Sequence, residues 1–167
     1  MSTTLKQKIQ EKITTLPELK KLVSFWQASG EKVVFTNGVF DLLHTGHITY
    51  LADAASLGTK LIIGLNSDAS VKRLNKGPER PVNDQDSRAL LLAAMLFIDA
   101  VVIFDEDTPL NLIATLMPDV LAKGGDYTVD TIVGAKEVIA NGGEVKVISF
   151  VDGFSSTAII RKIKSAQ

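Results

Sequence analysis

The only two histidines of this 167-residue chain are His44 and His47, three positions apart in the segment GVFDLLHTGH. Residues at this spacing share one face of a helix, so a helix that begins here would present both imidazoles together. The first turn of a helix also presents backbone N–H groups and the positive end of the helix dipole, and both favour an anion. The pair therefore predicts a site for phosphate oxygens.

Two other interpretations of the histidines compete with this one. In the structural interpretation His44 caps the helix and His47 packs into the core, and only their coincidence at an expected ligand-binding turn favours a function. In the metal interpretation Asp41 joins them as a third ligand. Zinc sites usually take three or four ligands with orienting partners, and the chain has no cysteine and no further histidine. We therefore expect no metal ion that the protein holds by itself.

Three further segments carry polar or charged side chains that are candidates for substrate binding. Lys72 follows the second apolar run, Asp126 lies in the turn LAKGGDY, and Ser155, Ser156 and Thr157 precede the last predicted helix. Hydroxyls and amides at the positive end of a helix favour a polyphosphate. The structural alternatives are a solvated lysine, an aspartate that helps the turn and a serine that caps the helix.

Arg88 lies near a predicted helix start, where a positive charge opposes the helix dipole unless it is paired. We expect Asp84 or Asp86 to pair with it. The alternative is that Arg88 stabilises the wall of the site.

Short β-branched runs alternate with segments of helical length. The predicted strands are 33–36, 61–65, 101–104, 120–123 and 145–150, and the predicted helices are 17–28, 46–57, 84–97, 108–117, 131–140 and 156–165. This alternation predicts an α/β fold, a doubly wound Rossmann-like parallel sheet of five strands with helices on both faces. Ligands of such sheets bind beyond the carboxyl ends of the strands. We expect one domain over residues 1–167, with an N-terminal helical extension over about 1–30.

Two common nucleotide-binding motifs are absent from the sequence. The three-glycine spacing of a dinucleotide-binding turn does not occur, and there is no Gly-Lys pair for a Walker A loop. A nucleotide site here must therefore use a different arrangement.

The composition of the chain argues against nucleic acid and membranes as binding partners. With 18 basic and 19 acidic residues the net charge is −1, so no global field would draw the chain to nucleic acid or to an anionic membrane. Residues 1–15 lack the apolar core of a signal peptide, and the longest apolar run, 89–98, is too short to span a bilayer. We expect a cytoplasmic protein.

The segment GVFDLLHTGH resembles the signature of the cytidylyltransferase-like nucleotidyltransferases, whose hallmark is HxGH after the first strand. A wider set of segments is similar to the heptose 1-phosphate adenylyltransferases of bacterial ADP-heptose synthesis, over about residues 16–163. These segments are TNGVFDLLHTGHITYLADAASLG, LNSDASVKRLNKGPERPVN, FDEDTP, LAKGGDY and VDGFSST.

The resemblance implies an activity. AMP would pass from ATP to D-glycero-β-D-manno-heptose 1-phosphate, giving ADP-heptose for lipopolysaccharide core and releasing pyrophosphate, with Mg²⁺ held mainly by the nucleotide. A homodimer and a separate heptose kinase are also implied. The alternatives are a CTP-dependent cytidylyltransferase that acts on glycerol 3-phosphate or another alcohol phosphate, and a non-catalytic nucleotide-binding module.

The resemblance also assigns roles to residues. His44, His47 and Lys72 would be catalytic, with Lys76 the poorer alternative to Lys72 as the lysine that contacts phosphate. The residues expected to bind nucleotide or phosphate are Thr36, Asn37, Gly38, Phe40, Gly46, Ser155, Ser156 and Thr157. Those expected to bind nucleotide or acceptor are Asp41, Arg88, Gly125 and Asp126.

Overall fold

Six parallel strands form one sheet in the computed structural model, which describes residues 3–75, 77–149 and 153–166. The strand order is β1-β4-β3-β2-β5-β6, and every neighbouring pair is parallel. The strands are β1 Ile13–Thr14, β2 Val33–Gly38, β3 Lys60–Asn66, β4 Ala100–Phe104, β5 Val120–Gly124 and β6 Glu144–Ile148. The predicted α/β class is confirmed.

The prediction of five strands was wrong by one. Strand β1 has two residues, with Ile13 opposite Val101 and Thr14 opposite Val102 at the edge of the sheet. Two residues are too few to produce a period-two pattern, so no sequence signal marked this strand. The last residue of the predicted strand 145–150 lies outside the described residues.

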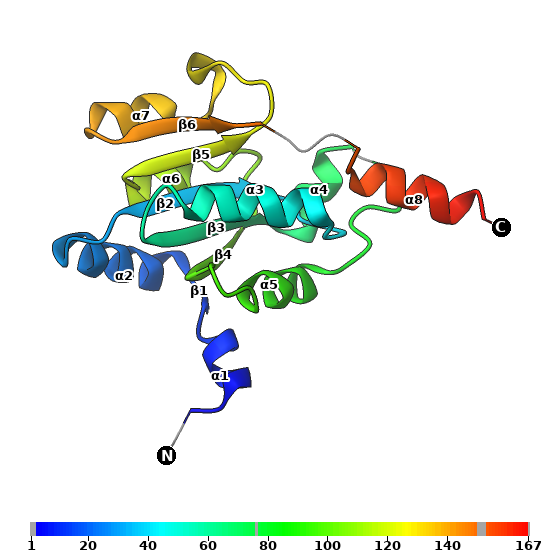
Figure 1. Cartoon of the computed structure of the whole chain (residues 1–167), viewed down its shortest axis with the longest axis horizontal. Helices are drawn as coiled ribbons and strands as arrows, with labels where there is room; N and C mark the ends of the chain where they lie inside the picture. Colours follow the sequence, from blue (N-terminus) through cyan, green and yellow to red (C-terminus); the bar gives the residue numbers. More distant parts are fainter. Residues whose placement is uncertain (1–2, 76, 150–152, 167) are drawn as a thin grey trace.

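Helices cover both faces of the sheet (Figure 1). On one face, α2 Leu16–Ala28, α6 Leu110–Leu116 and α7 Ala135–Ala140 pack against strand residues such as Val33 and Phe35. On the other face, α3 Thr45–Ala55 and α5 Gln85–Ala93 pack against Val34 and its neighbours. Because successive strand residues face opposite sides, the apolar run of β2 supplies both cores.

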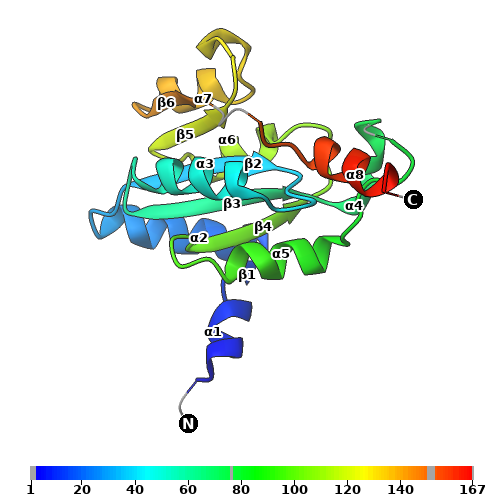
Figure 2. The same ribbon diagram turned by 45° about the vertical axis from the view of Figure 1, so that its right-hand side comes forward.

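The remaining helices lie at the margins of the sheet. They are α1 Leu5–Gln10, α4 Asp68–Arg73, the 3-10 turn Val129–Thr131 and α8 Ser156–Lys164. Figure 2 shows α1 projecting from the body and α8 running along the end of the sheet. Helix α1 lies within the predicted N-terminal helical extension over about 1–30, although no separate helix was predicted there, and α4 was not predicted as a helix. Among the described residues, no helix combines the length and the apolar character needed to cross a membrane.

The predicted helix 131–140 begins later than expected. Gly134 has φ of 84° and separates the 3-10 turn from α7. A Cβ at Gly134 would lie 2.6 Å from Cδ1 of Ile113, so both the backbone conformation and the close approach of α6 require glycine there.

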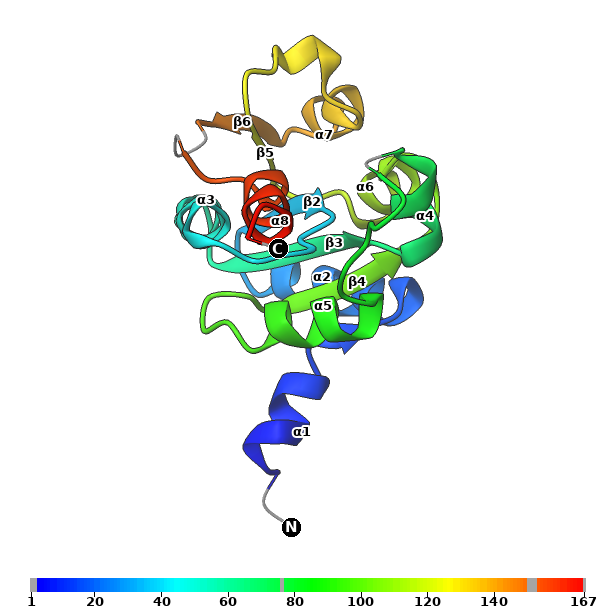
Figure 3. The same ribbon diagram turned by 90° about the vertical axis from the view of Figure 1, so that its right-hand side faces the viewer.

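The strand order reverses beside β2, which places the ligand-binding edge. From β2 the chain moves through α3 to β3 and β4 on one side, and it later returns to β5 and β6 on the other. The carboxyl ends of β2 and β5 therefore diverge at a topological switch point, where ligands of open α/β sheets bind. Figure 3 looks towards this edge, with α8 in front of β2, between α3 and α6.

Candidate active site

A cavity of about 550 Å³ opens at the carboxyl ends of β2 and β5. Three segments contribute most of its lining: the end of β2 with the turn into α3, the end of β5, and the start of α8. The lining residues are Asn37, Gly38, Val39, Phe40, Asp41, His44, Gly46, His47, Tyr50, Arg80, Lys123, Gly124, Tyr127, Gly153, Phe154, Ser155, Ser156 and Thr157. Most of the predicted phosphate-binding residues therefore share one cavity.

The two histidines stack at the entrance to α3. Their ring centroids are 3.8 Å apart and their planes are inclined by 23°, and the ring of Phe40 meets His47 edge-on at 5.4 Å. His44 is the N-cap residue of α3, but its side chain makes no capping hydrogen bond. The Nδ1 atoms of both histidines are buried and have no hydrogen-bond partner among the described residues. The expected structural alternative, a capping His44, is therefore wrong.

Burial keeps both imidazoles neutral at pH 7. The pKa of His47 is lowered to about 4, chiefly because burial disfavours the charged ring, and also because His44 and the guanidinium of Arg80 lie nearby. Burial also lowers the pKa of His44. A neutral imidazole carries one N–H donor, so the pair can donate hydrogen bonds to phosphate oxygens without adding charge.

Two glycines and one strained residue allow this close packing. A Cβ at Gly46 would lie 3.1 Å from His44 Nδ1 and 3.1 Å from Cβ of Phe154, so the HxGH glycine lets α8 approach the histidines. A Cβ at Gly38 would lie 2.9 Å from the ring of Phe40. Phe40 itself has φ of 47°, a left-handed conformation that bulky residues rarely adopt and that often marks a functional site.

The start of α8 forms the third wall of the cavity. Ser155 is the N-cap, and its hydroxyl accepts a hydrogen bond from the N–H of Ala158 at 3.0 Å. The hydroxyl of Ser156 donates to the carbonyl of Leu42 at 3.0 Å, which ties α8 to the turn before α3. The predicted serine cap is therefore present, and the first turn of α8 still faces the cavity with its positive end.

Arg80 is one of two cations in the lining that the sequence analysis did not select. Its side chain is only 7% exposed, and its Nε lies 2.5 Å from Oδ2 of Asp41 without hydrogen-bond alignment. The only signal for it was its position in the segment NKGPERPVN, which precedes the predicted helix 84–97.

Lys123 is the other cation. Its Nζ donates to Oδ1 of Asn37 at 3.1 Å and lies 5.9 Å from the centroid of the Tyr127 ring. The segment LAKGGDY indicated this turn, but the predicted site residues were Gly125 and Asp126 and not Lys123.

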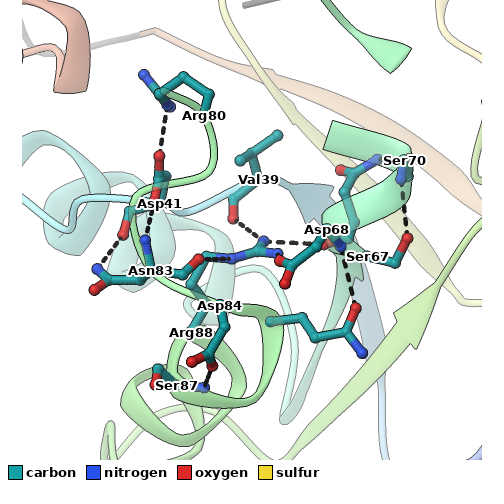
Figure 4. A network of polar contacts seen from close by, with 12 residues as sticks. Val39, Asp41, Ser67, Asp68, Ser70, Arg80, Asn83, Asp84, Ser87 and Arg88 are labelled. Atoms are coloured by element: carbon teal, nitrogen blue, oxygen red, sulfur yellow. Dashed lines mark hydrogen bonds and ion pairs between the residues drawn. The ribbon is translucent and has the colours of Figure 1, made fainter. Parts of the chain in front are cut away.

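Asp41 holds the loop that carries Arg80. Its carboxylate accepts hydrogen bonds from the N–H of Val82, at 2.8 and 2.9 Å, and from the N–H of Asn83 at 2.9 Å (Figure 4). The side chain of Asn83 donates to the carbonyl of Asp41 at 2.8 Å. Since the carboxylate is buried and occupied, its binding to a nucleotide or acceptor stays a prediction that this arrangement does not favour.

Arg88 connects four segments around the site. Its guanidinium is fully buried and donates to the carbonyls of Val39, Asn66 and Asn83 and to the carboxylate of Asp68, at 2.6 to 3.0 Å (Figure 4).

The expected partners of Arg88 are therefore corrected. The prediction that Arg88 pairs with Asp84 or Asp86 was wrong, because Asp84 caps α5 through the N–H of Ser87 at 2.7 Å. The alternative, that Arg88 stabilises the wall of the site, stays a prediction, and the hydrogen bonds to the backbone of Val39, Asn66 and Asn83 agree with it.

Five predicted site residues do not line the cavity, and the buried Arg88 described above is one of them. Thr36 is buried beneath it, with its hydroxyl 2.6 Å from the hydroxyl of Tyr50. Lys72 is exposed on α4, Gly125 is buried behind the rim, and Asp126 is exposed beyond it. Lys76 lies outside the described residues. Binding roles for these residues stay predictions.

Known proteins resemble this chain. A sequence model of the family described as cytidylyltransferase-like matches residues 35–162. The chain is 55% identical over 153 residues to the bifunctional protein HldE of Pectobacterium carotovorum, and 56% identical over 155 residues to that of Geobacter sulfurreducens. These matches cover 92% and 93% of the chain but only 32% and 31% of the relatives, so the chain spans about a third of their length.

Solved structures share the fold. The crystal structure of a lipopolysaccharide core biosynthesis protein from Thermoplasma volcanium matches with a TM-score of 0.58 and 28% identity, over 73% of this chain and 98% of that one. Pantoate-β-alanine ligase from Francisella tularensis matches with a TM-score of 0.58 over 91% of this chain and 76% of that one. At 14% identity, the second match shows the fold alone.

Replacing Arg88 should destabilise the whole chain. The change Arg88→Met removes the buried hydrogen-bond donor of the three carbonyls and of Asp68. We therefore expect the free energy of unfolding, measured with urea, to fall by about 3–5 kcal/mol. Arg73→Met is the matched control, because Arg73 pairs with Asp105 and Asp107 at the exposed surface and its loss should leave the midpoint close to that of the wild type. Equal destabilisation by both variants would contradict this role of Arg88.

The histidines should titrate below their ordinary range. Proton NMR of the ring Cε1–H signals should place the His47 midpoint near pH 4 and the His44 midpoint below 6.5, with His44→Gln to assign the two. Because the folded pKa of His47 is the lower one, the unfolded chain takes up its proton first as the pH falls. The stability that neutral His47 contributes is therefore complete above about pH 6.5 and is lost towards pH 4. A His47 midpoint at 6.5 or higher would contradict the buried, neutral ring.

Proposed function

The chain belongs to the cytidylyltransferase-like family, and from this premise we propose that it is a nucleotidyltransferase that joins a nucleoside monophosphate to a sugar 1-phosphate. The observation that carries the proposal is the pair of stacked, neutral histidines that faces the start of α8 across one cavity. Neutral N–H donors on one wall and a positive helix end on the other suit a triphosphate that spans the cavity.

The reaction needs alignment more than proton transfer. An acceptor phosphate is already ionised near neutral pH, so its oxygen attacks the α-phosphorus without a general base. A new phosphorus–oxygen bond forms as the bond to the β-phosphate breaks, and pyrophosphate leaves in line. His44 and His47 donate hydrogen bonds to the α-phosphate oxygens, while Ser155, Ser156 and Thr157 and the amides of α8 hold the leaving end.

Charge on the triphosphate is balanced by a cation from the loop between α4 and α5. Arg80 is placed for this role, because it lines the cavity and lies close enough to His47 to lower the pKa of that ring. Lys72, which the family resemblance favoured, is exposed on α4 and outside the lining, so its role stays a prediction.

Magnesium enters with the nucleotide. Among the described residues that line the cavity, Asp41 has the only carboxylate, and that carboxylate is occupied by the loop around Asn83. This donor set suits phosphate oxygens better than a hard cation, so we propose that Mg²⁺ is bound chiefly through the phosphates, where it neutralises their charge.

The substrates that we propose are ATP and D-glycero-β-D-manno-heptose 1-phosphate, giving ADP-heptose for lipopolysaccharide core. Support comes from the five segments that resemble heptose 1-phosphate adenylyltransferases, from the identity of 55–56% to bifunctional HldE proteins, and from the likeness to a lipopolysaccharide core biosynthesis protein. CTP with glycerol 3-phosphate is the alternative pair, and a non-catalytic nucleotide-binding module is the alternative of another class.

The proposal also implies partners and a compartment. A sugar kinase must supply the heptose 1-phosphate, and the reaction would run in the cytoplasm, where ATP is available. We further propose a homodimer, which is supported by the large apolar side chains that the described chain leaves exposed, such as Leu5 on α1 and Leu96 after α5, at 79% and 96%.

Pyrophosphate release should identify the substrates. With Mg²⁺ present, ATP and CTP are each combined with heptose 1-phosphate and with glycerol 3-phosphate, and we expect turnover only with ATP and the heptose. His47→Ala should lower kcat by about 10²–10³-fold, the usual effect of losing one transition-state donor. Turnover with CTP alone would replace the proposed substrates, while nucleotide binding with no turnover in any pairing would favour the non-catalytic module.

Two matched variants should identify the cation that contacts the triphosphate. A hydrogen bond to a charged group is worth about 1.5–3 kcal/mol, so Arg80→Met should raise KM for ATP by about 10–100-fold. Lys72→Met removes an equal charge from outside the cavity and should change that KM by less than about twofold. The opposite ranking of the two variants would restore Lys72 as the phosphate-binding lysine.

A further inference from the structure

A second hollow, of about 350 Å³, lies beside the first and shares a wall with it. The shared wall consists of Asn37, Gly38, Val39, Lys123 and Tyr127, from the ends of β2 and β5. The other lining residues come from the ends of β3 and α4, the segment before α6, strand β5 and the 3-10 turn with the two residues after it. They are Asn66, Leu74, Asp107, Thr108, Pro109, Leu121, Thr131, Ile132 and Val133.

The two hollows offer different chemistry. The first contains both histidines, Arg80 and the positive end of α8, which suit a highly charged anion. The second contains the hydroxyls of Thr108 and Thr131 among apolar side chains, and its one carboxylate, Asp107, already pairs with Arg73 at 2.7 Å. Hydroxyls and apolar surface suit the neutral body of a polyol better than a polyphosphate.

The arrangement of the hollows fits an in-line reaction. The first is lined by residues of α3 and α8, and the second by residues beside α4 and α6. Figure 3 shows α8 in front of the end of β2, with α3 on one side and α4 and α6 on the other. An acceptor held in the second hollow would reach a phosphorus bound at the histidines across the shared wall, opposite a pyrophosphate held at the start of α8. In-line displacement requires this opposition of attacking and leaving oxygens.

Such an approach brings two anions together, because a phosphate attacks a phosphate. A cation placed between them offsets their repulsion and favours the charge of the transition state. Among the described residues, Lys123 is the only lysine or arginine that lines both hollows. Its hydrogen bond to Asn37 and its position over the Tyr127 ring hold the ammonium at the shared wall before substrate arrives.

We propose that the second hollow binds the acceptor sugar and that Lys123 binds the acceptor's phosphate and directs its oxygen towards the α-phosphorus. This inference rests on the proposed nucleotidyltransferase function and adds a residue that selects a phosphorylated acceptor. The two cations would then bind different substrates: Arg80 would bind the phosphates of the nucleotide, and Lys123 the phosphate of the acceptor.

The test uses Lys123→Met, which keeps the length of the side chain and removes its charge. Isothermal titration measures binding of heptose 1-phosphate and, separately, of a non-hydrolysable ATP analogue with Mg²⁺. We expect the dissociation constant of the sugar phosphate to rise at least tenfold and that of the analogue to change less than threefold. Lys123→Arg should recover part of the sugar phosphate binding, because it restores the charge at a somewhat different position.

Lys146→Met is the matched control, since Lys146 lies on the neighbouring strand β6 and pairs with Glu144 at the exposed surface. It should bind both ligands as the wild type does. Equal weakening of both ligands by Lys123→Met would assign Lys123 a purely structural role and overturn the inference, as would unchanged binding of the sugar phosphate.

These titrations, together with the assay of pyrophosphate release, distinguish failure of the proposed nucleotidyltransferase function from failure of the proposed role of Lys123. If the wild type binds both ligands but releases no pyrophosphate, the proposed function fails while the binding role of Lys123 is still decided by the variant. If pyrophosphate is released and Lys123→Met keeps the wild-type KM for the acceptor, the function stands and the role of Lys123 fails.

Discussion

A buried guanidinium is stable only if its N–H groups have hydrogen-bond acceptors and its charge has a partner, and Arg88 imposes this constraint on the site. Its guanidinium is fully buried and donates to the backbone after β2, to the end of β3, to the loop before α5 and to Asp68 at the start of α4. These four segments must therefore stay in register with one another. The hydrogen bond from Arg88 to the carbonyl of Val39 fixes the position of Val39. It thereby also positions the turn that leads to His44.

The site combines neutral hydrogen-bond donors with positively charged side chains. Burial favours the neutral form of the stacked imidazoles, so they offer hydrogen-bond donors without charge, whereas Arg80 and Lys123 bring positive charge into the lining. Neutral rings can approach each other to 3.8 Å, which two charged rings would resist. The lowered pKa of His47 is thus a condition of the packing that brings both donors to one place.

The sequence allowed the sheet and the main site to be predicted because their signals are local. The apolar runs gave five of the six strands, and the HxGH segment placed both histidines at the cavity. What could not be predicted depends on contacts between distant segments. The pairing of Arg88 with Asp68 instead of Asp84 requires α4 and α5 to meet, and Arg80 enters the cavity only because Asp41 binds the backbone at Val82 and Asn83. Strand β1 has only two residues, too few to show the alternation of apolar and polar residues that predicts a strand.

The last helix differs from the others in how it is attached. None of the side chains of α8 is buried, and its polar ties to the body are the hydroxyl of Ser156 on the carbonyl of Leu42 and the exposed ion pair of Lys164 with Glu79 at 3.3 Å. Elements that bury little surface open at a small fraction of the free energy needed to unfold the core. The wall that α8 forms is therefore held to the cavity by less free energy than the sheet that carries the histidines, and the part contributed by its exposed ion pair weakens as ionic strength rises.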